Sequence, residues 1–161
     1  QVHCIRPATV CGLSPRMRLD VSVNMLTYQG LKNGKITVFG GEQTRPNIHI
    51  QDMANVYRHF LTNPELPSGC YNAGFENLQI LDIAERVQQG TGAEIAVSES
   101  NDPRSYRQDS SKLLETGFQP QFSVQSAIDE ISTAYKNGEL PEGENCYTVK
   151  WMKHLQLEAN R

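Results

Sequence analysis

The sequence lacks the cysteine and histidine patterns that mark metal-binding and disulfide-rich proteins. Its four cysteines, Cys4, Cys11, Cys70 and Cys146, stand far apart and form no Cys-x-x-Cys pair, so they fit neither a zinc knuckle nor a disulfide framework. We expect reduced thiols, with Cys4 buried in a strand. The four histidines form no His-x-x-x-His pair, and we therefore expect no metal site.

Long apolar runs and basic clusters are also missing. No stretch approaches the ~18 consecutive apolar residues of a membrane span, and residues 1–6 lack the layout of a signal peptide. Fifteen Lys and Arg against 18 Asp and Glu give a formal net charge of -3 without a Lys/Arg-rich run, which disfavours nucleic acid as a partner. We expect a cytoplasmic protein that binds neither membrane nor nucleic acid.

The glycines form no phosphate-binding motif. Neither Gly-x-Gly-x-x-Gly nor Gly-x-x-x-x-Gly-Lys-Ser/Thr occurs, so the chain carries no self-contained dinucleotide or P-loop fingerprint. Ser14-Pro15 and Ser110-Ser111 do not form a nucleophile elbow, which disfavours hydrolase chemistry. The sequence opens on the apolar run Val2–Ile5 without an initiator methionine, and we expect that it starts in the middle of a longer chain.

What is present is an alternation of strand and helix patterns in one domain-sized chain of 161 residues. This alternation predicts an α/β fold. The polar stretch after Gly138 predicts a loose tail or a docked helix over residues 139–161. Strands are expected at 2–5, 35–39, 47–50, 69–73 and 93–97, and helices at 19–32, 52–63, 77–90, 110–115 and 123–138, with Asn77 and Ser123 as the caps of two of these helices. Apolar spacing predicts a buried face on three of the helices, made of Met53, Val56, Tyr57, Phe60 and Leu61, of Ile80, Ile83, Ala84 and Val87, and of Ala127, Ile128, Ile131 and Tyr135.

The segment from Arg45 to Asp52 is the densest cluster of functional groups. A strand here would place Arg45 at its mouth, where a planar guanidinium suits a pair of phosphate oxygens. Asp52 would begin the next helix and accept from that helix's free N–H groups. The alternative makes Arg45 a surface ion-pair partner and His49 a hydrogen-bonded core residue.

A second cluster, Asn101 to Arg107, offers two guanidinium groups, a carboxylate and a phenol within one loop. Such a loop suits a nucleotide, because a carboxylate can hold a ribose diol while an arginine neutralises phosphate. The alternative is a solvated loop in which Asp102-Pro103 makes a turn. Tyr28 and Lys32 also have the spacing of a proton-transfer pair, but this spacing is common by chance.

Five segments occur in the order found in one enzyme family. They are Arg6-Pro-Ala-Thr-Val-Cys-Gly12, Asn24-Met-Leu26, Ile36-Thr-Val-Phe-Gly40, Arg45-Pro-Asn-Ile-His-Ile-Gln-Asp52 and Asp102-Pro-Arg-Ser-Tyr-Arg-Gln-Asp-Ser-Ser-Lys112. In this order the chain resembles the C-terminal, substrate-binding part of the NAD-dependent nucleotide-sugar epimerase/dehydratase family, which are extended short-chain dehydrogenase/reductases. The resemblance implies an α/β fold without the N-terminal Gly-rich Rossmann half, a substrate-binding portion over 1–138 and a tail over 139–161.

The resemblance also implies ligand contacts. Pro7 and Thr9 lie in the loop where nicotinamide (NAD or NADP) meets the substrate, although Thr9 replaces the family's Asn and Cys11 its Tyr. The nucleotide-sugar contacts implied are the diphosphate for Asn24 and Met25, the nucleobase pocket for Val38 and Phe39, phosphate for Arg45, and ribose and phosphate for Asp102 and Arg104. The family's catalytic residues precede the segment matching Gln1. No catalytic residue is therefore expected here, and Tyr28–Lys32 is interpreted as a coincidence.

The function that follows is binding of a nucleotide-diphosphate sugar within an enzyme that performs hydride chemistry at the sugar C4, in surface-polysaccharide synthesis. This chain alone is expected to be inactive, and its uncovered strand edges favour homo-oligomers. Alternatives are a non-catalytic nucleotide-binding or interaction module, a 4-keto-sugar reductase of the same family, or a fragment that binds nothing. The sequence leaves the nucleotide, the sugar and the reaction outcome open.

Overall fold

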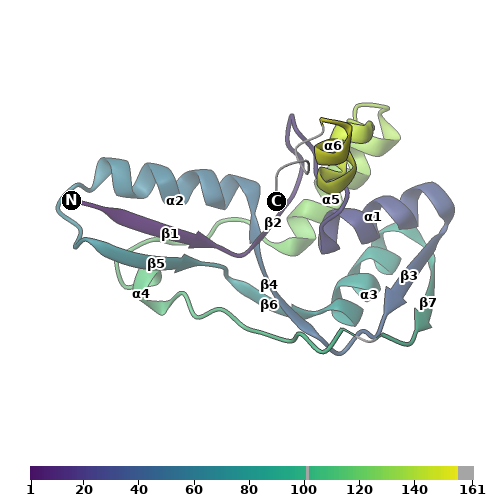
Figure 1. The fold of residues 1–161 in the computed structure, drawn as a ribbon, viewed down its shortest axis with the longest axis horizontal. Helices are drawn as coiled ribbons and strands as arrows, with labels where there is room; N and C mark the ends of the chain where they lie inside the picture. Colours follow the sequence, from purple (N-terminus) through teal and green to yellow (C-terminus); the bar gives the residue numbers. More distant parts are fainter. Residues whose placement is uncertain (101, 156–161) are drawn as a thin grey trace.

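The computed structural model describes residues 1–100 and 102–155. The chain is an α/β protein in which short strands alternate with helices, as predicted (Figure 1). The strands are β1 (His3–Pro7), β2 (Thr9–Cys11), β3 (Lys35–Phe39), β4 (Thr44–His49), β5 (Gly69–Ala73), β6 (Glu76–Gln79) and β7 (Glu94–Ser98). The helices are α1 (Ser22–Asn33), α2 (Ile50–Thr62), α3 (Ile80–Thr91), α4 (Ser111–Leu114), α5 (Val124–Lys136), a 3-10 turn η1 (Glu144–Cys146) and α6 (Thr148–His154).

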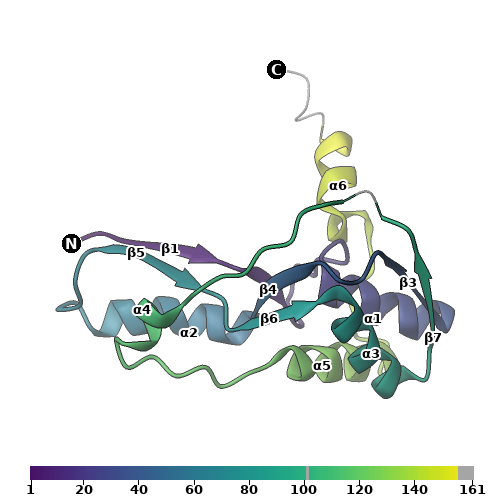
Figure 2. The ribbon, with the colours of Figure 1, turned by 90° about the horizontal axis from the view of Figure 1, so that it is seen from below.

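Three small sheets follow one another along the long axis of the molecule (Figure 1). At one end β1 pairs in parallel with β5, and α2 lies beside them. In the middle β4 pairs in parallel with β2 and antiparallel with β6. At the other end β3 pairs in parallel with β7, next to α1 and α3. Residues 102–110, which follow β7 in the chain, run back along the molecule to α4 (Figure 2).

Three buried clusters hold these parts together. Between α1, α3, α5 and β3 the core residues include Val23, Leu26, Ile36, Val38, Ile83, Val87 and Ile128. Under α2 they include Ile48, Met53, Val56, Phe60, Tyr71 and Leu113. Around the start of α1 they include Met17, Leu19, Tyr28, Ile131, Leu140 and Cys146. The apolar faces predicted for α3 and for the helix after Ser123 are the faces that the structure buries.

Helix α2 differs from the expectation in two ways. Met53, Val56 and Phe60 are buried, but Tyr57 and Leu61 on the same predicted stripe are exposed, because the described residues cover only one side of the helix. Asp52 does not cap α2. Instead, the Nδ1 atom of His49 accepts the backbone N–H of Gln51, 3.2 Å away, and the Asp52 carboxylate bonds to a different segment.

Two short strands escaped prediction, and one predicted cap was wrong. β2 has only three residues and lies among turn-forming prolines and glycines, while β6 is largely polar. Asn77 lies inside β6 and Gln79 caps α3, so Asn77 is not the cap. Ser123 does cap α5, as predicted, since its Oγ accepts the N–H of Ser126.

Cys4 is in β1 but exposed, because its side chain points away from α2.

The described part of the C-terminal segment is docked on the rest of the chain. Leu140 and Cys146 are buried in the cluster around α1, and the Leu19 N–H donates to the Cys146 carbonyl at 2.9 Å. Asp20 accepts the N–H of Thr148 at 2.9 Å, which fixes the start of α6. Residues 156–161 lie outside the described residues. Within the described residues, no helix has the length and apolar character needed to cross a bilayer.

Candidate functional site

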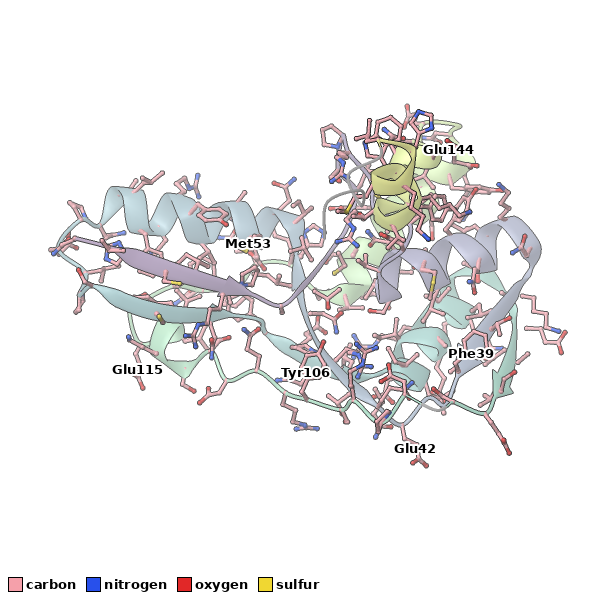
Figure 3. The ribbon with its side chains drawn as sticks, viewed as in Figure 1. Phe39, Glu42, Met53, Tyr106, Glu115 and Glu144 are labelled. Carbon is pink, nitrogen blue, oxygen red and sulfur yellow. The ribbon has the colours of Figure 1, made fainter. Side chains whose placement is uncertain are left out.

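The structure brings the two functional clusters of the sequence together at the beginning of β4. The Thr44 N–H donates to Ser105 Oγ at 3.0 Å, and the Tyr106 N–H donates to the Thr44 carbonyl at 3.3 Å. Residues 105 and 106, in the segment after β7, are therefore hydrogen-bonded to the first residue of β4, next to Arg45. Figure 3 shows Tyr106 on this segment, beside β4 and β6. Asn101, which the sequence grouped with this loop, lies outside the described residues.

Arg45 is the centre of the cluster. Its side chain is only 13% exposed, and Nη2 lies 3.2 Å from Oδ2 of Asp102. Nη1 donates to the carbonyl oxygens of Thr44 and Arg104. The guanidinium carbon lies 5.1 Å from the centroid of the Tyr106 ring, within cation–π range. The structure therefore brings Arg45 into contact with the second cluster. We call Arg45, Asp102, Arg104 and Tyr106 the Arg45 cluster.

One carboxylate in this cluster is shared between two guanidinium groups. Arg104 donates from Nε to Oδ1 of Asp102 and from Nη2 to Oδ2, each at 2.7 Å. These hydrogen bonds, followed by the charges of Arg104 and Arg45, hold the pKa of Asp102 far below its ordinary range. Two cations thus face one anion, which leaves a net positive charge. The Arg104 side chain is 76% exposed and free to meet an incoming anion.

Three hollows are lined by residues that the sequence analysis singled out or by their neighbours. The largest, of about 780 Å³, is lined by Pro7, Thr9, Cys11 and Asn24 among others. A second hollow of about 480 Å³ shares the wall formed by residues 7–9 and reaches Tyr106. A third, of about 470 Å³, lies between residues 40–43 and the loop that carries Asp102. Tyr106 therefore lines the second hollow and Asp102 the third, whereas the side chains of Arg45 and Arg104 are not among the residues that line the three hollows.

Asn24 lines the largest hollow, but its side chain is occupied. Its Oδ1 accepts the N–H of Gly12 at 3.0 Å, and its Nδ2 donates to the Arg18 carbonyl at 3.0 Å. The residue is 2% exposed. The amide therefore ties the loop after β2 to α1, and this shapes the wall of the hollow. Met25 is partly buried and packs against the core cluster of α1, α3 and α5.

The two residues predicted at a nucleobase pocket point in opposite directions. Val38 is fully buried in the core, so only its backbone can meet a ligand. The neighbouring Phe39 is 59% exposed at the end of β3 (Figure 3). Its carbonyl accepts from Gln43 at 2.6 Å, which folds the turn that borders the third hollow. β3 thus offers a ring and backbone groups rather than two side chains.

Cys11 and His49 form the buried floor next to the largest hollow. Burial, with a smaller effect from Glu76, raises the pKa of the Cys11 thiol to about 12, so it stays neutral at ordinary pH and cannot act as a base. His49 is buried as well, with Nε2 3.1 Å from Glu130 and its ring stacked on Phe122 at 4.8 Å. The alternative that treats His49 as a hydrogen-bonded core residue is the one the structure confirms.

Sequence reasoning missed the residues that hold the loop in place. The backbone N–H of Gln108 donates to Asn77 Oδ1 at 2.8 Å, and Asn77 Nδ2 donates back to the Gln108 carbonyl at 3.1 Å. The Gln108 side chain then donates to the Arg6 carbonyl at 2.9 Å. These bonds fasten the loop to both β6 and β1. Asn77 gave no signal, since a polar residue before a helix more often caps it.

Tyr28 and Lys32 do contact each other, although the sequence pattern was interpreted as a coincidence. Lys32 Nζ lies 2.5 Å from the Tyr28 hydroxyl, which donates to Glu142 Oε2 at 2.5 Å. Burial, followed by the hydrogen bond to Glu142, raises the pKa of Tyr28. A proton-transfer tyrosine needs the opposite shift. The three side chains form a latch between α1 and the C-terminal segment, and the raised pKa of Tyr28 does not favour proton transfer by this pair.

This latch should open in acid. The Tyr28 hydroxyl bond, followed by Lys32, lowers the pKa of Glu142, so its contribution is present above the unfolded pKa of about 4.3 and is lost as the pH falls through the lower folded value. Trp151, the one tryptophan of the chain, lies in α6, so its fluorescence reports release of the C-terminal segment from α1. We expect its emission to shift to longer wavelength below about pH 4, and Glu142→Gln to show that shift at pH 7. Glu139→Gln, on an exposed neighbouring residue, should behave as the parent chain; identical titrations for all three would disprove the latch.

Within the described residues, no group of three or more His, Cys, Asp or Glu side chains is placed to hold a metal ion. No family model matches the sequence. Several solved structures do match the fold. The chain is similar to the UDP-glucuronic acid 4-epimerase from Bacillus cereus in complex with UDP-glucuronic acid and NAD, with 27% identity, a TM-score of 0.69 and coverage of 83% of this chain and 44% of that one.

Two further structures match to the same degree. The UDP-N-acetylglucosamine 4-epimerase from Bacillus cereus has 20% identity, a TM-score of 0.71 and coverage of 88% of this chain and 47% of that one. The dTDP-glucose 4,6-dehydratase from Bacillus anthracis in complex with NAD has 17% identity, a TM-score of 0.71 and coverage of 92% and 47%. The chain thus spans less than half the length of each of these three structures.

These likenesses identify the class of protein. The chain has the α/β fold of part of an extended short-chain dehydrogenase/reductase. Within that class, the solved structures to which the chain is similar are NAD-dependent nucleotide-sugar epimerases and dehydratases, the family that the five ordered sequence segments resemble. The contacts predicted for individual residues are not established by these likenesses.

Proposed function

We propose that the chain is the nucleotide-sugar-binding portion of an NAD-dependent epimerase or dehydratase that acts in the cytoplasm on sugars for surface polysaccharides. The observation that carries the proposal is the Arg45 cluster, in which two guanidinium groups share the single carboxylate of Asp102 beside open hollows. Such a net positive, partly exposed pair suits a diphosphate, because each guanidinium can bind two oxygens. The binding energy of the nucleotide then positions the sugar.

Each group in the cluster has a separate role in the proposal. Arg45 and Arg104 bind the diphosphate oxygens, and the incoming charge replaces Asp102 as their partner. Asp102, released from one guanidinium, accepts from the ribose hydroxyls. Phe39 and the backbone of β3 border the base, since the Val38 side chain is buried in the core. Asn24 and Met25 support the wall from α1.

The largest hollow fits the nicotinamide end of the cofactor. Pro7 and Thr9 line it together with Val10 and Ile50, which form a largely apolar wall suited to a flat ring. When bound, NAD or NADP supplies hydride transfer at the sugar C4. Pro7 and Thr9 would orient the ring and exclude water, and the neutral Cys11 thiol adds no charge beside it. The rest of the cofactor would be held outside this chain.

Calorimetric titration of the 161-residue chain with UDP, GDP and dTDP tests the proposal. We expect saturable binding of at least one nucleoside diphosphate, and weaker binding of the matching monophosphate, since the second phosphate meets a guanidinium. Incubation with NAD and the matching nucleotide sugar should give no NADH signal, because the family's catalytic tyrosine and lysine are not in this sequence. Absence of binding to all three would refute the proposal, and NADH formation would refute the placement of catalysis elsewhere.

The exposed side of α2 supports self-association as part of the proposal. Tyr57 and Leu61 are 53% and 81% exposed on one face of that helix. Burying such apolar side chains against a second copy would be favourable. Sedimentation of the same samples reports whether copies associate with nucleotide present, and a monomer at every concentration would contradict this part.

A further inference from the structure

Two thiols stand opposite each other on the exposed face of the β1–β5 sheet. Cys4 and Cys70 are register partners in this parallel pair, and both are free and exposed. Their neighbours Ile5 and Tyr71 contribute to the cluster under α2. Because side chains alternate along a strand, the two thiols lie on the face away from α2.

The strand spacing lets the two sulfur atoms meet. Neighbouring strands lie about 4.8 Å apart, and the Cα atoms of a disulfide are commonly about 4.4–6.8 Å apart. Five consecutive register pairs, from His3 opposite Gly69 to Pro7 opposite Ala73, hold the two cysteine backbones at this spacing. The register therefore makes the two thiols neighbours on one face of the sheet.

The other two cysteines do not share these properties. Cys11 is 1% exposed, its Sγ lies 3.5 Å from the Ile48 carbonyl, and burial raises its pKa to about 12. Cys146 is 2% exposed in the cluster around α1. Only the thiols of the β1–β5 sheet are therefore open to a reagent among the four cysteines.

Arg6 is a cation on the same face as the exposed pair, two residues after Cys4 in β1. Lys112 lies on the other face of β5, because its Nζ is 4.3 Å from the centroid of the buried Tyr71 ring while it donates to the Cys70 carbonyl at 3.1 Å. Arg6 attracts anionic thiol reagents such as glutathione disulfide, whose carboxylates carry negative charge at neutral pH.

We propose that Cys4 and Cys70 form a redox-sensitive dithiol site that glutathione disulfide converts into an intramolecular disulfide. One cysteine thiolate attacks a sulfur of the reagent, which forms a mixed disulfide and expels one glutathione thiolate. The second cysteine loses its proton and attacks the protein sulfur of that mixed disulfide, which expels the second glutathione. The chain loses two electrons and two protons, and one glutathione disulfide becomes two glutathione thiols. The new bond fixes β1 to β5, whose ends Pro7 and Asn72 line the 480 Å³ hollow.

Peptide mapping by mass spectrometry after treatment with glutathione disulfide tests this proposal. The parent chain should yield a linked peptide pair containing Cys4 and Cys70 and lose two hydrogen atoms. Cys4→Ser and Cys70→Ser should each stop at one stable mixed disulfide with glutathione. Cys146→Ser is the matched control and should form the same linked pair as the parent. Two mixed disulfides without the internal bond, a link between two chains, or no reaction would each overturn the proposal.

A trivalent arsenical gives an independent measurement, because one arsenic atom bonds two neighbouring thiols at once. We expect phenylarsine oxide to bind the parent chain at least about tenfold more tightly than either single serine variant, since the second bond forms intramolecularly. Equal affinity for the parent and the two variants would overturn the proximity of the thiols. Both substitutions are at exposed positions, and unfolding curves of the variants establish that they fold.

Discussion

Replacing Arg45 with alanine is expected to weaken nucleoside diphosphate binding by about tenfold to a hundredfold. The side chain is mostly buried, and its Nη atoms already bond to Asp102 and to the Arg104 carbonyl, so it is held in place before a ligand arrives. Hydrogen bonds to a charged group contribute about 1.5–3 kcal/mol each, and every 1.4 kcal/mol is about a tenfold change in affinity. The measurement is calorimetric titration with the nucleoside diphosphate that binds the parent chain.

Two further variants separate phosphate binding from general effects of charge. Arg58→Ala removes an exposed arginine of α2 and should leave affinity within about twofold, since it lies outside the cluster and surface charges act weakly. Arg45→Lys keeps the charge but loses the planar fork, and should recover only part of the affinity. If Arg45→Ala folds normally and binds as tightly as Arg58→Ala, the proposed diphosphate site is wrong.

The sequence singled out both segments of this cluster but did not predict the contact between them. Arg45 and the loop of Asp102 were singled out because each carried groups that suit phosphate, and the structure bonds one to the other. Sequence patterns report the chemistry of a segment and its local structure. They could not predict that Asp102 is shared by two guanidinium groups, because this depends on how the segment after β7 returns along the molecule (Figure 2).

Side-chain direction was the weakest part of the sequence reasoning. Val38 and Phe39 are adjacent in one strand, so they must point to opposite faces, and only one of them can face a ligand. Asn24 looked available as a polar residue in a helix, yet its amide is used twice by backbone groups of the preceding loop. Such bonds depend on the path of a loop whose strand β2 was not predicted.

Long-range partners explain the remaining misses. Tyr28 and Lys32 are four residues apart, but Glu142, which completes their latch, comes from the polar segment that offered no pattern to place it. Asp52 was assigned to its own helix because an acidic residue in a first turn is normally used there. Its true partners are 69 and 70 residues away in the chain.

Those partners make Asp52 the position where one substitution should destabilise the fold most. Its side chain is fully buried, and its oxygens accept the N–H groups of Gln121 at 3.0 and 3.2 Å and of Phe122 at 3.0 Å. These groups precede α5 directly, so the carboxylate joins α2 to α5. Asp52→Ala leaves both donors without this acceptor, at a cost of about 1–3 kcal/mol for each buried unsatisfied group. We expect the free energy of unfolding in urea to fall by about 3 kcal/mol.

The destabilisation caused by Asp52→Ala should extend to the residues that form the floor of the largest hollow. Phe122 stacks on His49, which caps α2 and lies so close to Gly12, just after β2, that a Cβ there would be 2.8 Å from its Nε2. Asp52→Asn keeps one acceptor oxygen and should lose less stability than alanine, whereas Asp129→Ala, on the exposed side of α5, should stay within about 0.5 kcal/mol of the parent chain. Equal urea midpoints for Asp52→Ala and Asp129→Ala, with unchanged slopes, would mean that these hydrogen bonds do not join the two helices.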